Sequence, residues 1–453
     1  MNKVLHIVHC VDTEGPLYES LDATSERIEK TFGLKYENLT PKMLESLQRG
    51  ENIPENLKAD VMSFLSPERL SYKKTWSEVS EMVDELMTDD WRNKYKDDYG
   101  NGYKFNWFIL DHVGFENANP RRRATGYHVV YEYFHEKIRI NEVSDKLYWH
   151  YHSTPFFYEA HKTSNNFSFS NHHLQVLSRR IIDKQDFPAA YRPGAHTERP
   201  DSNLFLEQWV PFDYGNQGMP EREEDKKQKD IGGGRYGDWR RAPSDWGTYH
   251  PDFYDYQKKG NMKRYLARCL NLGSRLREIN TSEIEKAFKQ VSTQGSTIIS
   301  ITNHDEREMR QDIDIFMNNI YEIQKKYPDV KIKHSNAVDA IRDIENLSFE
   351  NHTKLKIEIE ENKINISADK EIWGPQPYFC FKTKDQRYIH ENLDYHGGLD
   401  WSYVFDDDTI RLDQIEKIGL ATNDNFGNTS VYNLSEKSGF MEIEETLLNY
   451  NEN

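Results

Sequence analysis

Cysteine is scarce in this chain, which has only three among its 453 residues. Cys10, Cys269 and Cys380 lie far apart in the sequence, and their number is odd. A disulfide framework needs paired cysteines, and a cysteine-based zinc site needs cysteines at short spacings, so neither is expected here.

Long apolar runs and a targeting leader are also missing. No apolar stretch reaches the roughly 20 residues that span a membrane. The first residues do not have the basic segment, apolar segment and cleavage site of a secretory leader, and the first strand candidate begins near Met1. We therefore expect a cytoplasmic protein that does not insert into a membrane.

Positive charge is in deficit, with 59 Lys and Arg against 76 Asp and Glu and a net charge of −17. A surface this acidic repels the phosphates of nucleic acids and anionic membranes, so neither is an expected partner. Aromatic residues are plentiful by contrast, at 13% of the chain. Their rings can stack on the C–H faces of sugars, which fits a carbohydrate ligand, although most of them must fill the core. Nothing in the composition indicates an oligomeric state.

Apolar strand candidates alternate with helical segments through the first three quarters of the chain. They include 105–111, 146–152 and 297–302. A polar stretch with helix-start signals, from about 23 to 98, separates the first strand candidate from the second, and we expect a helical insertion there. Strands that alternate with helices predict parallel βα units.

The pattern changes near residue 345. Lys354–Glu360 alternates strictly between polar and apolar residues, Glu361-Asn362 is a two-residue turn candidate, and Lys363–Ile366 alternates again, which predicts a hairpin. Further strand candidates are Tyr378–Phe381, Thr409–Leu412, Lys417–Ala421 and Thr429–Tyr432. We therefore expect a separate β-sandwich over 346–453.

The strongest chemical signal lies near the N-terminus, where the apolar run 6–11 ends on Asp12, Thr13 and Glu14 and then on Gly15-Pro16. The run is typical of a buried strand bounded by a turn. In α/β folds, ligands and catalytic groups collect at the carboxyl ends of such strands. The two acids could also be a solvated loop acid and a helix cap, but similar polar clusters at later strand ends favour a functional site.

His150 and His152 lie two residues apart on the third strand candidate. Side chains alternate along a strand, so both imidazoles leave the same face with Cα atoms about 6.5–7 Å apart. Two histidine nitrogens at this spacing can reach one ion, and Glu14 can supply a third ligand, as in zinc sites with an open position. A lone His-x-His pair is more often two ordinary strand histidines, but beside the acids it predicts a metal site. Alternative histidine ligands are His112, His161, His172, His173 and His196.

Two more polar residues stand at later strand ends. Arg192 follows a short apolar run, and His304 closes the strand candidate 297–302. An arginine beside a carboxylate lowers the pKa of that acid and orients it, although a cap or surface ion pair would use the same residue. An imidazole at this edge can deliver a proton to a leaving amine. Asp305 could orient His304, but a cap on the following helix is the simpler prediction.

The order of these motifs resembles that of the polysaccharide deacetylase superfamily, the NodB-homology domain. That family ends its first strand on two acids, which Asp12 and Glu14 match, with Glu in place of the usual second Asp. Its second motif, His-Ser/Thr-x-x-His, is similar to His152–Phe156, where Phe156 stands in place of the second histidine. His150 can take the place of that missing ligand.

The later motifs of the family follow in the same order, over a resemblance that extends to about residue 346. The arginine motif resembles Arg192-Pro193-Gly194, and the final apolar-x-His motif resembles Ile301–His304 with one residue of slack. The Asp-Trp element between them is similar to Asp238-Trp239. The segments 187–194 and 209–213 also resemble a subgroup associated with surface-glycan and O-antigen assembly.

This resemblance implies a distorted (β/α)7-type barrel of parallel strands over 1–345, with the helical insertion after the first strand. It implies hydrolysis of an N-acetyl group on a sugar or glycan precursor, in surface polysaccharide biosynthesis. One divalent metal would be bound by Glu14, His150 and His152, with zinc expected first and cobalt, nickel or manganese as alternatives. Asp12 would be the general base, held ionised by Arg192, and His304 would protonate the leaving amine.

The loop 237–256 is rich in aromatic residues beside Asp238. Its rings could form walls that stack on a sugar, and packing of the loop on the barrel would explain the same residues equally well: Trp239, Trp246, Tyr249 and Tyr254.

Two other classes of protein fit parts of the pattern. A glycoside hydrolase on a related barrel would use a carboxylate pair, such as Asp12 or Glu14 with Asp213. A glycan-binding or scaffold protein with a degenerate site would explain Phe156 and the added β-domain. Bound metal would distinguish the deacetylase from the glycosidase, and acetate release would distinguish it from the scaffold.

Overall fold

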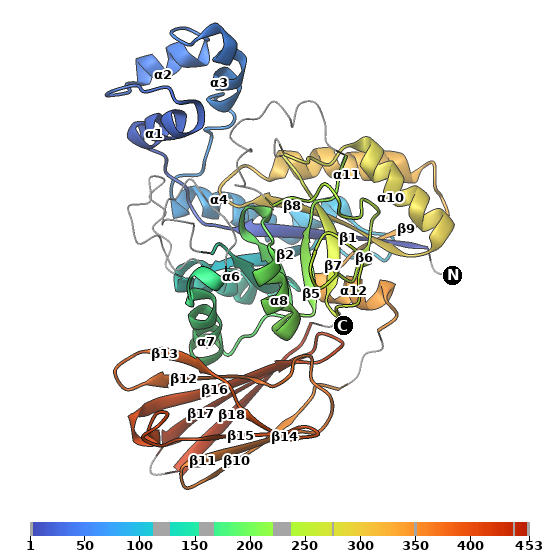
Figure 1. The fold of residues 1–453 in the computed structure, drawn as a ribbon. Coiled ribbons are helices and arrows are strands. Elements are labelled where there is room, and N and C mark those ends of the chain that lie inside the picture. The colour runs from blue at the N-terminus through green and yellow to red at the C-terminus, as the bar shows by residue number, and fades with distance from the viewer. Residues whose placement is uncertain are drawn as a thin grey trace.

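Seven parallel strands close into a barrel at the centre of the computed structural model (Figure 1). The structure describes residues 3–111, 127–153, 167–220, 237–273, 276–347, 351–437 and 440–450. Each barrel strand pairs with the next and the last pairs with the first, which confirms the predicted (β/α)7-type barrel. In order around the ring, the strands are β1 (Val4–Thr13), β2 (Phe105–Asp111), β3 (Lys146–Tyr151), β4 (Ala190–Pro193), β5 (Phe212–Asn216), β7 (Tyr265–Asn271) and β8 (Thr297–His304).

Strand β1 is the central strand of this sheet. It has ten residues, all buried. One edge pairs with β8 along most of its length. The other edge is divided between β9 (Lys331–His334), which pairs with residues 4–7, and β2, which pairs with residues 9–13. A mostly apolar strand fits this enclosure on both faces.

Helices surround the barrel, and one of them covers its amino end. The outer helices are α6 (Tyr127–Asn141), α7 (His172–Lys184), α8 (Pro200–Trp209), α10 (Thr281–Gln294) and α11 (Arg310–Gln324). The short helix α12 (Ala337–Ile344) packs on the apolar side chains of the barrel interior. Its first residue is tied there, because the carbonyl of Ala337 accepts a hydrogen bond from the Tyr214 hydroxyl at 2.5 Å. The opposite, carboxyl end of the barrel is therefore where ligands can enter.

The insertion between β1 and β2 is helical, as predicted. Helices α4 (Trp76–Leu86) and α5 (Asp89–Arg92) pack on the outside of the barrel. Helices α1 (Leu21–Phe32), α2 (Pro41–Gln48) and α3 (Lys58–Phe64) form a small lobe that projects from the barrel at the upper left of Figure 1. This helical lobe, residues 21–64, has a core of its own around Ile28, Val61 and Phe64.

Two antiparallel sheets follow the barrel and form the β-domain at the bottom of Figure 1. They enclose an apolar core that includes Ile364, Phe379 and Leu420. The four-stranded sheet contains β10 (Leu355–Glu360), β11 (Lys363–Ala368), β15 (Asp400–Val404) and β14 (Asp394–Gly397). The five-stranded sheet contains β13 (Tyr388–Glu391), β12 (Tyr378–Thr383), β16 (Ile415–Asn423), β17 (Thr429–Lys437) and β18 (Phe440–Leu448).

Most of the sequence predictions for this domain agree with the structure, and one is wrong. The predicted hairpin is β10–β11, with Glu361 at a φ of 52° in its turn. The strand predicted at Thr409–Leu412 does not form. Thr409 instead closes a turn, in which its backbone N–H donates to the Asp406 carboxylate at 3.0 Å, and a 3-10 helix, Leu412–Gln414, follows.

The β-domain is attached to the barrel through helix α7. Aromatic and aliphatic residues of β3, α7 and α8 share one core with Tyr378, Cys380, Ala421 and Val431 of the β-domain. Asn433 adds hydrogen bonds from its amide to the carbonyls of Ile181 and Ile182, at 3.1 and 3.3 Å. Because the two parts share one apolar core, their contact is packed like the interior of a single domain.

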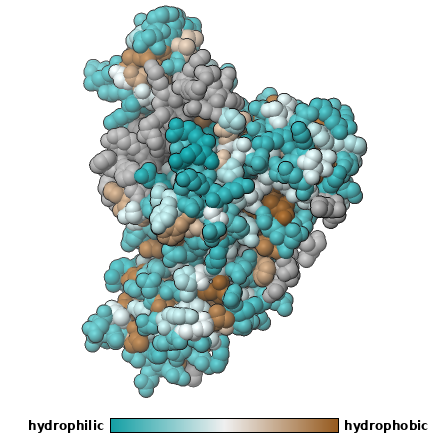
Figure 2. Space-filling model, turned by 45° about the vertical axis from the view of Figure 1, so that its right-hand side comes forward, coloured by the Kyte–Doolittle hydropathy of each residue, from teal (hydrophilic) through white to brown (hydrophobic). Residues whose placement is uncertain are grey.

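The face of the molecule seen in Figure 2 is mainly hydrophilic. In the view of Figure 2, hydrophobic residues form separate spots among hydrophilic ones. None of the described helices combines the length and the apolar character that crossing a membrane requires.

Candidate metal centre

Strand alternation places four predicted site residues at the carboxyl rim of the barrel, on its inner side. The residues two positions earlier on the same strands, such as Cys10, Tyr148 and Ala190, belong to the core inside the barrel. The residues between them, such as Val11 and Trp149, belong to cores outside it. Side chains two apart on a strand share a face, so this rim collects Asp12, His150, Arg192 and His304.

Glu14, His150 and His152 converge at this rim and form a group that could hold a metal ion. Glu14 Oε1 lies 3.2 Å from His152 Nε2 and 3.7 Å from His150 Nε2, and the two Nε2 atoms are 3.1 Å apart. Ligand atoms in a tetrahedral zinc site, with bonds of about 2.0–2.1 Å, are about 3.3 Å apart. The three separations bracket this value, and among the described residues no other cluster of three such groups occurs.

The hydrogen bonding of His150 suits a metal ligand. Its Nδ1 lies 3.1 Å from the carbonyl oxygen of Arg192. A carbonyl can only accept, so we assign the proton to Nδ1, which leaves Nε2 unprotonated and directed at Glu14 and His152. Metal-ligating histidines have this second hydrogen bond, because it sets the tautomer and fixes the ring. One carboxylate and two imidazoles also make the donor set of open zinc sites, so the residues fit a divalent ion.

Asp12 and Arg192 form a buried ion pair beside the triad. The guanidinium donates from Nε to Asp12 Oδ1 at 2.6 Å and from Nη2 to Oδ2 at 3.1 Å. Burial is the largest single influence on Asp12 and raises its pKa. The charge and hydrogen bonds of Arg192, with further contributions from His150 and His304, together outweigh burial and hold the pKa well below its usual range. Asp12 is therefore an ionised carboxylate with a fixed orientation.

Arg192 is held by further contacts. Its Nη1 donates to the carbonyl of Tyr214 at 2.5 Å, and its Nη2 lies 3.4 Å from His196 Nδ1. Burial acts against the charge of this fully buried guanidinium, but neighbouring groups, Asp12 first among them, together raise the pKa of Arg192. The predicted pairing of Arg192 with the carboxylate of Asp12 is thus present in the structure.

His304 faces Asp12 from the neighbouring strand. Its Nε2 lies 4.0 Å from Asp12 Oδ2, and 27% of its side chain is exposed, whereas Asp12 is buried. Burial of the imidazole lowers the pKa of His304, and Asp12 only partly offsets this effect. His304 is therefore the most accessible member of the rim and is mostly neutral near pH 7.

Asp305 does not cap the following helix, contrary to the simpler prediction. Helix α11 begins five residues later and has no side-chain cap. The Asp305 carboxylate instead accepts hydrogen bonds from the backbone N–H groups of Glu14, at 2.7 Å, and of Gly15, at 3.0 and 3.2 Å. It thus binds the turn that presents a triad ligand.

His196, one of the alternative ligands considered from the sequence, lies at the rim beside Arg192 but is not part of the triad. It follows Arg192 by four residues, in a turn where Ala195 and His196 both have positive φ, at 50° and 52°. Such strained backbone concentrates at functional sites. Burial first, and then the charge of Arg192, lower the pKa of His196 well below its usual value. The only sequence signal is that it is a histidine near a strand end.

The other reserve histidines do not join the triad. His172 and His173 begin helix α7, where His173 stacks on Phe167 with ring centroids 4.7 Å apart. His112 and His161 lie outside the described residues, as does Phe156.

Three of the aromatic residues proposed as sugar-stacking walls are buried, so that prediction is wrong for them. Trp239, Trp246 and Tyr249 are 0%, 3% and 5% exposed. The Trp239 indole donates to the carbonyl of His196 at 2.7 Å, and the Trp246 indole donates to the carbonyl of Glu283 at 2.9 Å. The Tyr249 hydroxyl donates to the carbonyl of Tyr256. These rings hold the loop 237–256 on the barrel and are not available to a ligand.

The other two residues of this loop that the sequence analysis singled out, Tyr254 and Asp238, are at least partly exposed. Tyr254 is 81% exposed. Asp238 pairs with Arg240, whose Nε lies 2.9 Å from its carboxylate. The hydrogen bonds from Arg240 lower the pKa of Asp238 to about 2. Asp238 therefore has a local partner of its own in Arg240.

Asp213 cannot pair with Asp12 as a glycosidase acid. Its strand neighbours Phe212 and Tyr214 point into the barrel, so Asp213 points outward. There its carboxylate accepts a hydrogen bond at 2.5 Å from Arg264, which is itself buried and paired with Glu198. Asp12 and Asp213 therefore do not form the carboxylate pair that a glycoside hydrolase would need.

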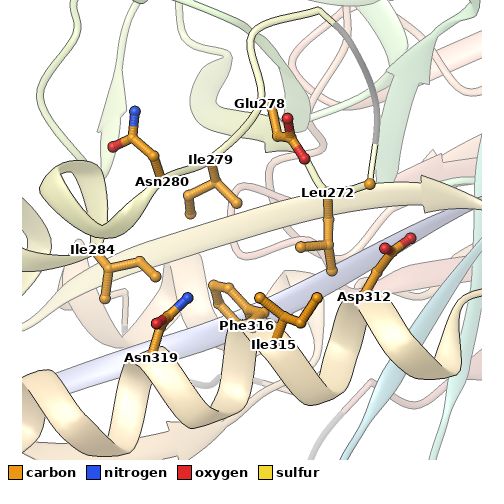
Figure 3. A pocket seen from close by; sticks show the side chains of 10 residues that line it. Leu272, Glu278, Ile279, Asn280, Ile284, Asp312, Ile315, Phe316 and Asn319 are labelled. Atoms are coloured by element: carbon orange, nitrogen blue, oxygen red, sulfur yellow. The ribbon is translucent and has the colours of Figure 1, made fainter.

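A small pocket of the barrel lies away from the triad, between the β7–α10 loop and helix α11 (Figure 3). Glu278 and Asp312 stand at one end of it, and Asn280 and Asn319 at the other, with apolar side chains between them. None of the predicted site residues lines this pocket.

Comparison of the chain with protein-family models, with curated proteins and with solved structures gives no match. The geometry of the rim is therefore the basis for any functional assignment.

Proposed function

We propose that this protein is a metal-dependent hydrolase that removes the N-acetyl group from an amino sugar in a glycan or glycan precursor. One observation carries the proposal: a Glu/His/His triad lies beside an arginine-paired aspartate and an accessible histidine, all on one rim. This set supplies each group that amide hydrolysis needs. It is also the arrangement implied by the resemblance of the sequence to the polysaccharide deacetylase superfamily.

Glu14, His150 and His152 would hold the metal, and we propose zinc first, with cobalt, nickel and manganese as alternatives. When bound, such an ion polarises the acyl carbonyl and lowers the pKa of a water molecule to about 7. His150 keeps its Nε2 free for this role through the hydrogen bond between Nδ1 and the carbonyl of Arg192.

Asp12 would accept the proton of the attacking water. Its low pKa makes it a weak base, but it also guarantees that the carboxylate is ionised at any pH at which the enzyme works. Arg192 keeps both oxygens of Asp12 oriented through its two hydrogen bonds. The water oxygen then bonds to the acyl carbon.

His304 would complete the reaction by protonating the nitrogen as the C–N bond breaks, which yields acetate and a free amine. Its Nε2 lies 4.0 Å from Asp12 Oδ2, so the proton that Asp12 takes from water would pass to His304 and then to the leaving nitrogen. The exposure of His304 lets it reach the substrate. General acids of this kind contribute about 10²–10⁴-fold to the rate.

The test is acetate release by the purified protein supplied with zinc, cobalt or manganese. We would assay N-acetylglucosamine as the free sugar, as a β-1,4-linked oligomer and as a nucleotide sugar. We expect acetate from at least one of these probes, and a loss of about 10²-fold or more in Asp12→Asn. Glu14→Gln should lose both bound metal and activity, because it removes one of three ligands.

His173→Gln is the matched control, since it changes a buried histidine that stacks on Phe167 outside the triad. It should keep the metal stoichiometry and the activity of the wild type. Wild-type protein that binds no divalent metal would sink the proposal. Protein that binds metal but releases no acetate from any probe would indicate a glycan-binding function instead.

A further inference from the structure

We propose that Asp305 is a positioning residue for Glu14 and that it sets the affinity of the triad for a divalent ion. The inference rests on the proposed function only in taking Glu14, His150 and His152 as the metal ligands. Asp305 acts on the metal site through the backbone of the Glu14 turn.

Glu14 lies just beyond the end of β1, outside the backbone hydrogen bonds of the barrel sheet. Strand β1 ends at Thr13, and its ladders with β2 and β8 end at Thr13 and Asp12. Gly15 then turns the chain with a φ of 71°, and Pro16 has no N–H to offer. The position of the Glu14 carboxylate therefore depends on what binds the N–H groups of Glu14 and Gly15.

The carboxylate of Asp305 binds both of these groups. Its Oδ1 accepts from Glu14 N at 2.7 Å and from Gly15 N at 3.2 Å, and its Oδ2 accepts from Gly15 N at 3.0 Å. Asp305 is fully buried, so water does not compete for these bonds. Hydrogen bonds to an ionised, buried acceptor are about twice as strong as those between neutral groups.

Asp305 is itself anchored to the rim and to the insertion. It follows His304, which pairs with Asp12 in the sheet. The carbonyl of Glu306 accepts a hydrogen bond from Lys73 N at 2.8 Å, and the carbonyl of Lys73 accepts one from Leu17 N at 2.9 Å. The segment after β8 is thus bonded to the chain where it leaves the helical lobe, and that chain is bonded to the segment that enters the lobe. Asp305 is therefore held in a fixed position beside Glu14.

Groups that orient metal ligands in this way change metal affinity by about 10–100-fold when they are removed. Asp305→Asn preserves size and one acceptor oxygen, but it removes the second acceptor and places an NH₂ group against the N–H of Gly15, which now donates to Oδ2. We therefore expect Glu14 to lose its fixed position while all three ligands stay in the chain.

The experiment is a zinc titration of metal-free protein by calorimetry and by competition with a chromophoric chelator. Asp305→Asn should bind zinc about 10–100-fold more weakly than the wild type. The matched control is Asp424→Asn, because Asp424 is also buried and accepts two backbone N–H groups, those of Phe426 and Asn428, both at 2.9 Å. Asp424 belongs to the β-domain, so its variant should lower the melting temperature but keep the zinc affinity.

A second readout is the visible spectrum of the cobalt-loaded protein, which reports ligand geometry without any substrate. At saturating cobalt, the absorption bands of Asp305→Asn should shift, and those of Asp424→Asn should match the wild type. If Asp305→Asn does not fold, Asp305→Glu gives the same test, since one extra methylene displaces the carboxylate.

Equal zinc affinity and an unchanged cobalt spectrum in the Asp305 variant would overturn the inference. A wild-type protein that binds zinc tightly but releases no acetate would overturn the proposed function alone. A wild-type protein without affinity for zinc or cobalt would overturn both.

Discussion

Arg192 is the single residue on which the charge balance of the rim depends. It is fully buried, and its hydrogen bonds go to Asp12 and to the carbonyl of Tyr214. A buried carboxylate without its cation is costly, because the desolvation of the charge is no longer offset. The residue therefore links the stability of the barrel to the proposed chemistry.

Arg192→Gln should lower the free energy of unfolding by about 3–5 kcal/mol, since it leaves Asp12 buried without its partner. Activity should fall by about 10²-fold or more, because the pKa of Asp12 then rises with burial. Zinc should still bind, because the backbone carbonyl that holds His150 remains. Urea denaturation, acetate release and metal content measure the three effects.

Arg240→Gln is the control for this prediction, because Arg240 forms an exposed ion pair with Asp238. Exposed pairs contribute about 0–1 kcal/mol, so stability and activity should stay close to those of the wild type. If Arg192→Gln proved as stable as Arg240→Gln, another group would have to neutralise Asp12.

Part of the site could be predicted residue by residue. The alternation of side chains along a strand is enough to place His150 and His152 on one face. The apolar run 6–11 is enough to predict the strand that ends at Asp12 and Glu14. The partner of Asp305 could not be predicted, because it depends on where the β1 turn meets the end of β8, some 290 residues apart in the sequence. The sequence could not decide between packing and sugar stacking for Trp239 for the same reason, since its indole binds the carbonyl of His196 on another loop.

At the scale of elements, β1 is the strand that pairs with β2, β8 and β9. One of its histidines, His9, is kept neutral by burial. His9 is fully buried between the Tyr103 hydroxyl, 2.7 Å from Nδ1, and the Asn303 side-chain oxygen, 2.9 Å from Nε2. Burial lowers the pKa of His9 from 6.5 to about 4, although the hydrogen bond with Asn303 partly opposes this. The folded barrel therefore excludes a proton that the unfolded chain binds.

This pKa shift predicts a loss of stability in acid. Above pH 6.5 His9 is neutral in both states and makes no pH-dependent contribution. As the pH falls from 6.5 towards 4, the unfolded state gains a proton that the folded state does not, and stability drops by up to about 3 kcal/mol. Urea denaturation at steps between pH 7 and pH 4 measures the slope.

His9→Gln should flatten this slope, because glutamine does not titrate. His396→Gln, at an exposed position of β14, is the control and should leave the slope unchanged. A slope that is the same in wild type and in His9→Gln would place the acid-sensitive group elsewhere.

The elements that could be predicted are those whose sequence pattern matches their surroundings. The apolar runs of β2, β3 and β8 are buried on both faces except at the start of β3 and the end of β8, and the alternating β10–β11 hairpin covers one face of a core. Strand β15, which is not among the predicted strands, also places alternate residues, Trp401 and Tyr403, in the core. The two-residue strand β6 exists only through its pairing with β7, which no local pattern reveals.

At the scale of the whole molecule, the shared core at α7 makes the barrel and the β-domain depend on each other. Tyr378 lies at its centre, with its ring centroid 5.0 Å from that of Trp209 and 5.5 Å from that of Phe187. Its hydroxyl donates to the carbonyl of Leu174 at 2.7 Å. A core of this kind predicts that the two parts unfold together.

Tyr378→Ala should lower stability by about 3–5 kcal/mol, as for other large buried aromatic side chains. Scanning calorimetry should show one transition that moves to lower temperature as a unit. Tyr395→Ala, which changes a tyrosine that is 63% exposed on β14, should leave the transition in place. Two separate transitions, of which only one moves, would show that the domains unfold independently.

The pairing of β1 with β8 and β9 has a consequence for synthesis of the protein. The first strand emerges from the ribosome long before its partners, which begin at residues 297 and 331. At about 5–20 residues per second, the nascent chain waits on the order of 15–60 s before the barrel can close. During that time a strand of ten residues, most of them apolar, can pair with β2 but is left without β8 and β9. A chaperone that shields it should therefore raise the yield of folded protein.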